Sequence, residues 1–316
     1  MFSYARTMGR FVEWADAEGI VPADIELFDV EDYLGSLTQQ NGEPYSAHSL
    51  RTYCKDVRTL LNFAHDRKIF ADRIKVDLPK TEDSIEALSD AELEIVLPYF
   101  EDQAAADSTN FEGLRNAGIV HMLKDAGLRV SELLALNWTD ISWDPERQIG
   151  TIQVTKQMNR KREMVSPKNG KDRVTFFYAD TWKWLELYKV EEGLRMIEIA
   201  AKSTKGWSSE GWDQLPFDTS PGRPIFWLSY GDPERLGHAG LGKLLRNAGK
   251  KLGIRLYPHL FRHTAGRLLT KAGVTPIALM QLLGHSSMTM VLRYGQLWGE
   301  DLEDVVYQKM VGNGKH

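Results

Sequence analysis

Hydrophobic residues recur every three to four positions along three stretches of the first quarter of the chain. The stretches are 4–19, 29–42 and 46–68. This spacing is the period of an α-helix that buries one face. Either Ser46 or Ser49 is placed to cap the third helix, because a serine hydroxyl accepts a hydrogen bond from a free backbone N–H at a helix start. We therefore predict that residues 1–78 form a small helical bundle.

The helical pattern is interrupted over 79–84, where a proline and charged residues predict a linker. It resumes at Ser89, and Glu92 three residues later completes a capping box, which is typical of a helix start. Further on, Gly127 separates two more helical stretches and is a natural helix end, since glycine adopts the left-handed conformation without strain. Residues 85–316 are thus predicted to form a second domain.

Strand-like patterns occur in one part of this second domain. The predicted strands are Thr151–Val154, Glu163–Ser166 and Arg173–Tyr178. The last two are predicted to be hairpin partners, joined by a turn at 168–171. The stretch 203–224 is rich in Gly, Ser, Trp and Pro, and is predicted to be a long surface loop. The expected fold class is mainly α: an N-terminal helical bundle, then a mixed α+β domain with a small antiparallel sheet.

The formal net charge of −5, taken alone, argues against a nucleic-acid ligand, because phosphate binding needs clustered Lys and Arg. The distribution of charge changes this picture. No Asp or Glu occurs from 235 to 299, a stretch with ten Lys and Arg residues, and a second basic cluster spans 156–173. A basic run alone is also typical of a solvated surface, so it leaves DNA binding open. The predicted DNA contacts are Lys156, Arg160, Lys161, Lys171, Arg173, Lys243, Arg246, Lys250 and Lys251.

The sequence contains neither a run of about eighteen apolar residues nor a basic leader followed by an apolar segment. We therefore expect a soluble protein that stays inside the cell. Its single cysteine, Cys54, cannot form an internal disulfide and is predicted to be a small buried core residue. The spacing of metal-ligand residue types and of glycines predicts no metal, no cofactor and no ATP site.

Four motifs follow one another in the second domain: AGLRVSELLALNW, SPKNGKDRV, HLFRHTAGRLL and LLGHSSMTMVLRYG. Together they resemble the catalytic half of the tyrosine recombinases of the phage-integrase and Xer kind, over about 84–300. The N-terminal bundle is similar to that family's core-binding domain in size and helix content. The resemblance implies a site-specific recombinase or integrase that cuts and rejoins double-stranded DNA through a covalent 3′-phosphotyrosine. It also implies a tetramer of the protein on DNA.

The resemblance further implies a set of six catalytic residues. They are Arg129, Lys168, His259, Arg262, His285 and Tyr294. In the family, the two arginines bind the scissile phosphate, to which a guanidinium fork is suited because it pairs with two oxygens and stays charged. The tyrosine attacks that phosphate, and its phenol, with a pKa of about 10, needs positive surroundings to do so.

Local spacing is compatible with these roles. His259 and Arg262 lie about one helical turn apart on the same face, and Pro258 suits the first turn of their helix. An unbroken helix would put His285 and Tyr294 on opposite sides, but Gly284 ends the preceding helix and leaves His285 in a turn. His263, a quarter-turn from Arg262, is interpreted as a structural histidine.

Two assignments stay open at this stage. Lys168 is implied as the acid that protonates the leaving 5′ oxygen, and Lys156, Lys161 and Lys171 are close competitors for that role. Glu132 is interpreted either as a residue that orients an arginine or as an ordinary helix-surface residue.

Two alternative functions also fit parts of the pattern. A type IB topoisomerase uses a similar pocket to relax DNA, and a DNA-binding protein can keep the fold without cutting. After the tyrosine, the amphipathic segment 299–312 is predicted to be an interaction helix, either folded back on its own domain or docked on a neighbouring subunit, and we favour the neighbour.

Overall fold

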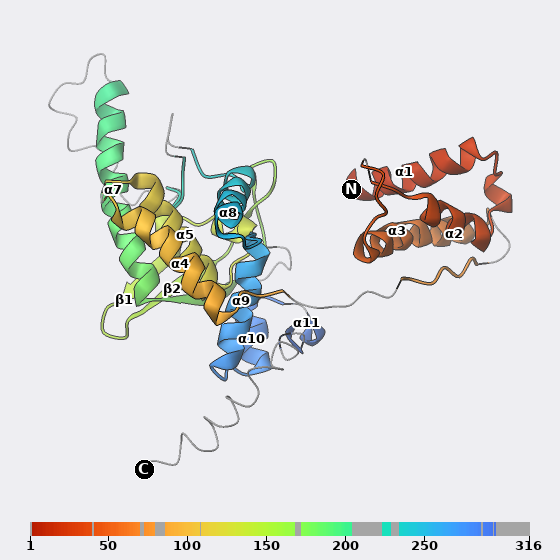
Figure 1. Cartoon of the computed structure of the whole chain (residues 1–316). Coiled ribbons are helices and arrows are strands. Elements are labelled where there is room, and N and C mark those ends of the chain that lie inside the picture. Colours follow the sequence, from red (N-terminus) through yellow and green to blue (C-terminus); the bar gives the residue numbers. More distant parts are fainter. Residues whose placement is uncertain are drawn as a thin grey trace, which may run out of the picture. The chain divides into compact units, whose positions relative to one another are not determined.

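A computed structural model describes residues 2–39, 41–69, 73–79, 86–107, 109–167, 172–203, 223–228, 234–285, 287–292 and 294. The chain separates into two compact units, Met1–Asp83 and Ser84–His316 (Figure 1). Each unit has its own hydrophobic core. Among the described residues, no helix combines the length and apolar character needed to cross a bilayer.

The described residues of the first unit form three α-helices. They are α1 (Phe2–Ala17), α2 (Leu27–Ser36) and α3 (Ala47–Asp66), with a short 3-10 turn at Pro22–Asp24. Of the two serines considered for the start of α3, Ser46 is the cap: its hydroxyl accepts a hydrogen bond from the Ser49 N–H at 3.3 Å. Cys54 is fully buried beside Phe11 and Val57, as predicted. The helix predicted over 29–42 is wrong at its end, because the chain leaves α2 after Ser36.

The second unit holds the remaining helices. They are α4 (Asp90–Ala105), α5 (Phe111–Ala126), α6 (Val130–Leu133), α7 (Ala179–Ser203), α8 (His238–Leu252), α9 (Pro258–Lys271), α10 (Pro276–Leu283) and α11 (Met288–Leu292), with a 3-10 turn at Trp138–Asp140. The capping box of Ser89 and Glu92 is confirmed at the start of α4. Helix α5 is buried along nearly its whole length and packs against α4, α7 and α9, so it is the centre of this domain.

A small antiparallel sheet completes the second unit. Its strands are β1 (Ile141–Asp144), β2 (Ile149–Val154) and β5 (Arg173–Tyr178), in the order β1-β2-β5. A separate two-stranded ribbon is made by β3 (Gln157–Met158) and β4 (Met164–Val165). The predicted fold class, mainly α with a small antiparallel sheet, is confirmed.

The predicted pairing of strands was wrong in two respects. Strands β1 and β3 were not predicted, because runs of four and two residues are too short to stand out as strands in the sequence. The second and third predicted strands are not partners: β5 pairs with β2, and β4 pairs with β3. The ribbon is thus an excursion between β2 and β5. The turn predicted at 168–171 lies outside the described residues.

Candidate active site

Arg129 is positioned by the sharp end of α5. Gly127 has a φ of 57°, and a Cβ there would lie 2.5 Å from Leu283 Cδ2, so only glycine permits both the turn and the close approach of α10. The chain then places Arg129 at the N-cap of α6. Its Nη1 donates to Glu132 Oε1 at 2.8 Å and its Nη2 to the Gly284 carbonyl at 2.7 Å.

Glu132 is fully buried and collects hydrogen bonds from two arginines. It accepts from Nη1 and Nη2 of Arg173, both at 2.7 Å, and from the side chain and backbone N–H of Arg129, both at 2.8 Å. Arg262 Nη1 lies 4.0 Å away. Burial by itself raises the pKa of Glu132, but the hydrogen bonds and charges of Arg173 and Arg129 outweigh it and bring the pKa down to about 2. The interpretation of Glu132 as a residue that orients an arginine therefore agrees with its placement.

The same arginines bind the carboxyl end of α10. Arg173 Nε donates to the Leu282 carbonyl at 2.9 Å, Arg262 donates to the Leu283 carbonyl, and Arg129 donates to the Gly284 carbonyl. A helix end with free carbonyls carries a partial negative charge. Three guanidiniums face one carboxylate and this partial charge, so the cluster keeps an excess of positive charge that suits a bound anion.

Arg262 and His259 project from the first turns of α9. Pro258 occupies the first turn of that helix, as predicted. Arg262 is buried, and Nη1 donates to the Gly127 carbonyl at 2.7 Å. Burial and the charge of Arg129 lower the pKa of Arg262 to about 9. His259 is exposed; partial desolvation and the charges of Arg262 and Arg129 lower its pKa.

The predicted break after α10 is present. Gly284 has a φ of 63° and ends the helix, and His285 follows it. The His285 ring lies parallel to the Tyr294 ring, with 5.9 Å between centroids and 6° between planes. Burial and the charges of Arg262 and Arg129 lower the pKa of His285 to about 3. Within the described part of the chain, the buried Nδ1 of His285 has no hydrogen-bond partner.

Tyr294 is 1% exposed and packs on α9. Burial raises the pKa of its phenol, and the charges of Arg262 and Arg129 act in the opposite direction. Its hydroxyl contacts His263 rather than His259: Oη lies 3.2 Å from His263 Nδ1. The interpretation of His263 as merely structural missed this contact. Adjacent helical positions point about 100° apart, and the Tyr294 ring packs over Gly266, three residues after His263 and on the same helix face.

A cavity of about 1070 Å³ lies between β5 and α10, next to this cluster. Arg129, His285 and Gly284 line one side of it. Lys168 and Lys171 lie outside the described residues, but the residues that flank this segment, Pro167 and Asp172, also line the cavity. Arg129 and His285 thus face an open volume that is large enough for a phosphodiester group.

Eight of the nine predicted DNA contacts, all but Lys171, are described residues. Arg160 and Lys161 are exposed at the turn of the β3–β4 ribbon, and Lys243, Arg246, Lys250 and Lys251 are exposed on α8. Lys156 pairs with Asp140 at 3.0 Å. Arg173 departs from the prediction: its side chain is 8% exposed and its charge is directed into the protein toward Glu132, so it does not belong to the basic surface.

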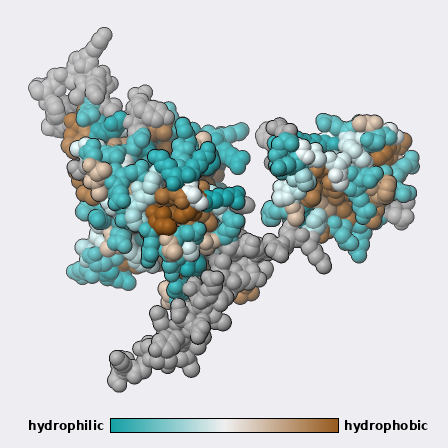
Figure 2. Space-filling view, in the orientation of Figure 1, coloured by the Kyte–Doolittle hydropathy of each residue, from teal (hydrophilic) through white to brown (hydrophobic). Residues whose placement is uncertain are grey.

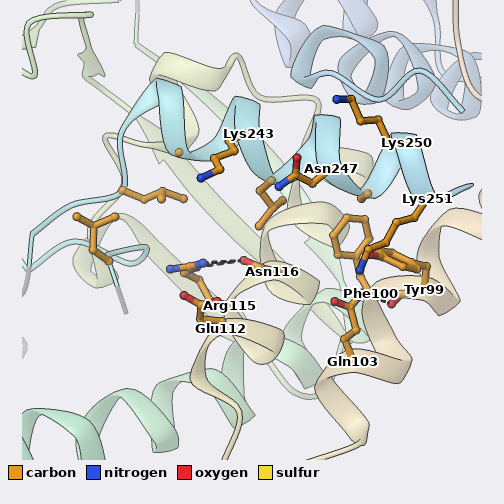
Figure 3. Close-up of a pocket in the computed structure, with 15 residues that line it drawn as sticks. Tyr99, Phe100, Gln103, Glu112, Arg115, Asn116, Lys243, Asn247, Lys250 and Lys251 are labelled. Atoms are coloured by element: carbon orange, nitrogen blue, oxygen red, sulfur yellow. Dashed lines mark hydrogen bonds between the residues drawn. The ribbon is translucent and has the colours of Figure 1, made fainter. Parts of the chain in front are cut away.

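A second cavity, of about 610 Å³, lies between α8 and the helices α4 and α5. Figure 3 shows Lys243 and Lys251 reaching from α8 over this cavity, with Phe100 and Arg115 on the other side. Figure 2 shows a hydrophobic patch surrounded by polar residues over the same elements. The lysines of α8 therefore border a cavity lined by both polar and apolar residues.

The family model described as "Phage integrase family" matches residues 100–298, which contain the whole arginine cluster and Tyr294. The chain belongs to the phage integrase family. The resemblance inferred from the four motifs is thereby confirmed.

This phage integrase family member is similar to curated tyrosine recombinases. It is 30% identical to tyrosine recombinase XerA of Saccharolobus solfataricus over 61% of this chain, and this match spans about half of that relative, 49%. It is 24% identical to tyrosine recombinase XerD of Vibrio cholerae, over 96% of this chain and 87% of the relative.

Two solved structures share the fold. The site-specific recombinase XerH bound to difH substrate has a TM-score of 0.64 at 18% identity, covering 95% of this chain and 77% of that one. The Tn1549 transposon integrase in complex with a circular intermediate DNA has a TM-score of 0.61 at 20% identity, covering 91% and 94%.

We predict that Glu132→Gln destabilises the protein by about 3–5 kcal/mol at pH 7, because it removes the only carboxylate that the described structure places within 4.0 Å of three arginines. The folded pKa of about 2 lies below the ordinary 4.5. The stabilisation from the charge is therefore fully present above pH 4.5 and is lost as the pH falls toward 2.

Urea unfolding of the wild type and of Glu132→Gln at pH 7 and pH 3 measures this effect. The matched control is Glu186→Gln at an exposed position, which is expected to change the free energy of unfolding by no more than about 0.5 kcal/mol. Equal free energies of unfolding for Glu132→Gln and Glu186→Gln at pH 7 would contradict the prediction.

Proposed function

We propose that this protein is a site-specific DNA recombinase that cuts and rejoins double-stranded DNA through a covalent 3′-phosphotyrosyl bond at Tyr294. The supporting observation is that Arg129, Arg262, His285 and Tyr294 come together at the carboxyl end of α10, in a member of the phage integrase family. The protein acts inside the cell, where its DNA substrate is.

In this proposal Arg129 and Arg262 bind the nonbridging oxygens of the scissile phosphate. The attack forms a bond between Tyr294 Oη and phosphorus and breaks the bond from phosphorus to the 5′ oxygen. The phenol loses a proton and the leaving 5′ oxygen gains one, with Lys168 as the proposed donor. One phosphodiester replaces another, so the energy of the bond is kept and ATP is not consumed.

The two arginines change partners when DNA binds. Their guanidiniums donate to Glu132 and to main-chain carbonyls. A phosphate oxygen is a charged acceptor and forms stronger hydrogen bonds than a carbonyl. Binding of the phosphodiester therefore draws donors from the carbonyls toward the substrate, while Glu132 keeps the arginine planes oriented.

His285 contributes an uncharged ring. A pKa of about 3 leaves it neutral at pH 7, and its Nδ1 is buried without a partner in the described structure. We propose that Nδ1 of His285 forms a hydrogen bond with the phosphate, because a buried polar group without a partner gains most from such a contact.

We predict that Tyr294→Phe abolishes the covalent adduct on a nicked suicide duplex that carries the cognate site, because phenylalanine keeps the ring stacked on His285 but lacks the attacking oxygen. Denaturing gel electrophoresis of labelled DNA detects the adduct. Tyr257→Phe is the matched control, because it removes a hydroxyl that donates a hydrogen bond to Glu86. This variant is expected to leave the yield of adduct unchanged.

An adduct of equal yield from Tyr294→Phe would refute the assignment of the nucleophile. Incubation of the wild type with supercoiled plasmid that lacks the site distinguishes the topoisomerase alternative, since only a site-independent enzyme relaxes that plasmid.

We propose that the ribbon turn and α8 contact the DNA backbone. Arg160→Ala together with Lys161→Ala is predicted to weaken binding to all sequences alike and to reduce the salt dependence of log K by about 2, since each phosphate contact contributes about 0.9. Gel-shift titrations from low to high salt measure the slope. The double variant Lys183→Ala and Lys189→Ala on α7 is the control, and an unchanged slope for the ribbon variant would contradict the proposal.

We propose that four copies assemble on two DNA sites and that the segment 300–316 docks on the neighbouring subunit. This segment lies outside the described residues, and its apolar positions have helical spacing. Its deletion is predicted to leave binding to a single site intact and to abolish the slower-migrating synaptic complex on native gels. Unchanged synapsis after the deletion would remove this assignment.

A further inference from the structure

The hydroxyl of Tyr294 has one hydrogen-bond neighbour among the described residues, and it is His263. Nδ1 of that histidine lies 3.2 Å from Oη, and the two ring centroids are 5.9 Å apart. His263 itself stacks on His259, with centroids 6.3 Å apart. None of the roles assigned above to the arginines and His285 accounts for a polar contact to the phenolic oxygen.

The ring of Tyr294 is also fixed on its other sides. Gly266, one turn after His263 on α9, lies under the ring so closely that a Cβ there would be 2.6 Å from Tyr294 Cε1. His285 lies parallel to the ring. These two contacts define the plane of the phenol, but neither sets the direction of the O–H bond. That direction is set only by the partner of the hydroxyl.

The charges around His263 keep its ring neutral. Its titratable and charged neighbours are His259 and Arg262 on α9, Glu86, His285 and Tyr294. Burial, followed by His259 and Arg262, lowers the pKa of His263 to about 4, and the opposing effect of Glu86 is smaller. Above pH 4 the ring therefore carries one proton, and Nδ1 is an acceptor when that proton is on Nε2.

We propose that His263 is a positioning residue for the nucleophile: its Nδ1 accepts the hydrogen bond of the Tyr294 hydroxyl and directs the oxygen lone pairs toward the scissile phosphate. This inference rests on the proposed function of Tyr294. If the O–H bond of the phenol rotated freely, the oxygen lone pairs would often point away from phosphorus. Effective attack requires that the reacting atoms be aligned.

Three substitutions of His263 test the hydrogen bond. His263→Leu removes the acceptor and keeps an apolar side chain. His263→Asn places an amide oxygen near the position of Nδ1, whereas His263→Gln places it one bond further out. Adduct formation on the suicide duplex is measured under single-turnover conditions, together with gel-shift affinity and melting temperature. Single-turnover rates report the chemical step apart from binding.

We expect His263→Leu to slow adduct formation at least about tenfold, the equivalent of one lost hydrogen bond, without change in DNA affinity. His263→Asn is expected to restore the rate to within about threefold of the wild type, an effect of less than one hydrogen bond, and His263→Gln is expected to stay slow. Equal rates for wild type and His263→Leu overturn the proposal. Equal slowing by folded His263→Asn and His263→Leu also overturns the proposal, because a side chain that only packs would not distinguish these two variants. If His263→Leu fails to fold, the rates of adduct formation of His263→Asn and His263→Gln decide between the two outcomes.

The ¹⁵N spectrum of the histidine rings in the free full-length protein gives a readout that does not depend on cleavage. The His263 signals should show an unprotonated Nδ1 at pH 7, and Tyr294→Phe should shift that signal. A protonated Nδ1 overturns the proposal whatever the enzyme does. If the wild type forms no adduct while the NMR signature is present, the proposed function fails and the hydrogen bond stands.

Discussion

The buried carboxylate of Glu132 is the interaction on which the rest of the site depends. It lies at 0% exposure among Arg129, Arg173 and Arg262, and each of these side chains also caps a different carbonyl at the end of α10. Without a carboxylate, three guanidiniums could not share so small a space, because unpaired buried charges cost several kcal/mol each. The carboxylate therefore makes a concentrated positive site possible.

This cluster also joins parts of the chain that are far apart in sequence. Glu132 follows α5, Arg173 begins β5, Arg262 lies on α9, and the carbonyls belong to α10. Because each guanidinium has several donors in a fixed plane, a small shift of any of these elements breaks more than one hydrogen bond. The geometry of the arginine cluster is thus set by the packing of the second unit, including the glycine turns that let α5 and α10 approach.

Local signals in the sequence predicted the features that depend on local chemistry. The caps at Ser89, Gly127 and Gly284 follow from backbone conformation and side-chain oxygens close by in the chain, and the bounds of β5 follow from its own alternation. The pairing of β3 with β4 was not predictable in the same way. It depends on which strands compete for one edge, and that is decided by tertiary packing.

The position of Tyr294, the proposed nucleophile, shows the same limit of local sequence signals. The motifs placed Tyr294 near the arginines, but its contact with His263 depends on how the chain after Gly284 returns to α9, and helical spacing on α9 alone does not contain that information. His263 and Gly266 lie one turn apart on α9, and this spacing indicates a contact once the Tyr294 ring is known to pack there. The glycine leaves room for the ring, and the histidine contacts its hydroxyl. In the proposed function, binding of the substrate phosphate and orientation of the nucleophile therefore belong to different faces of one helix, because Arg262 is proposed for the first and His263 for the second. This division lets the arginine cluster stay strongly positive while the histidine beside the phenol stays neutral.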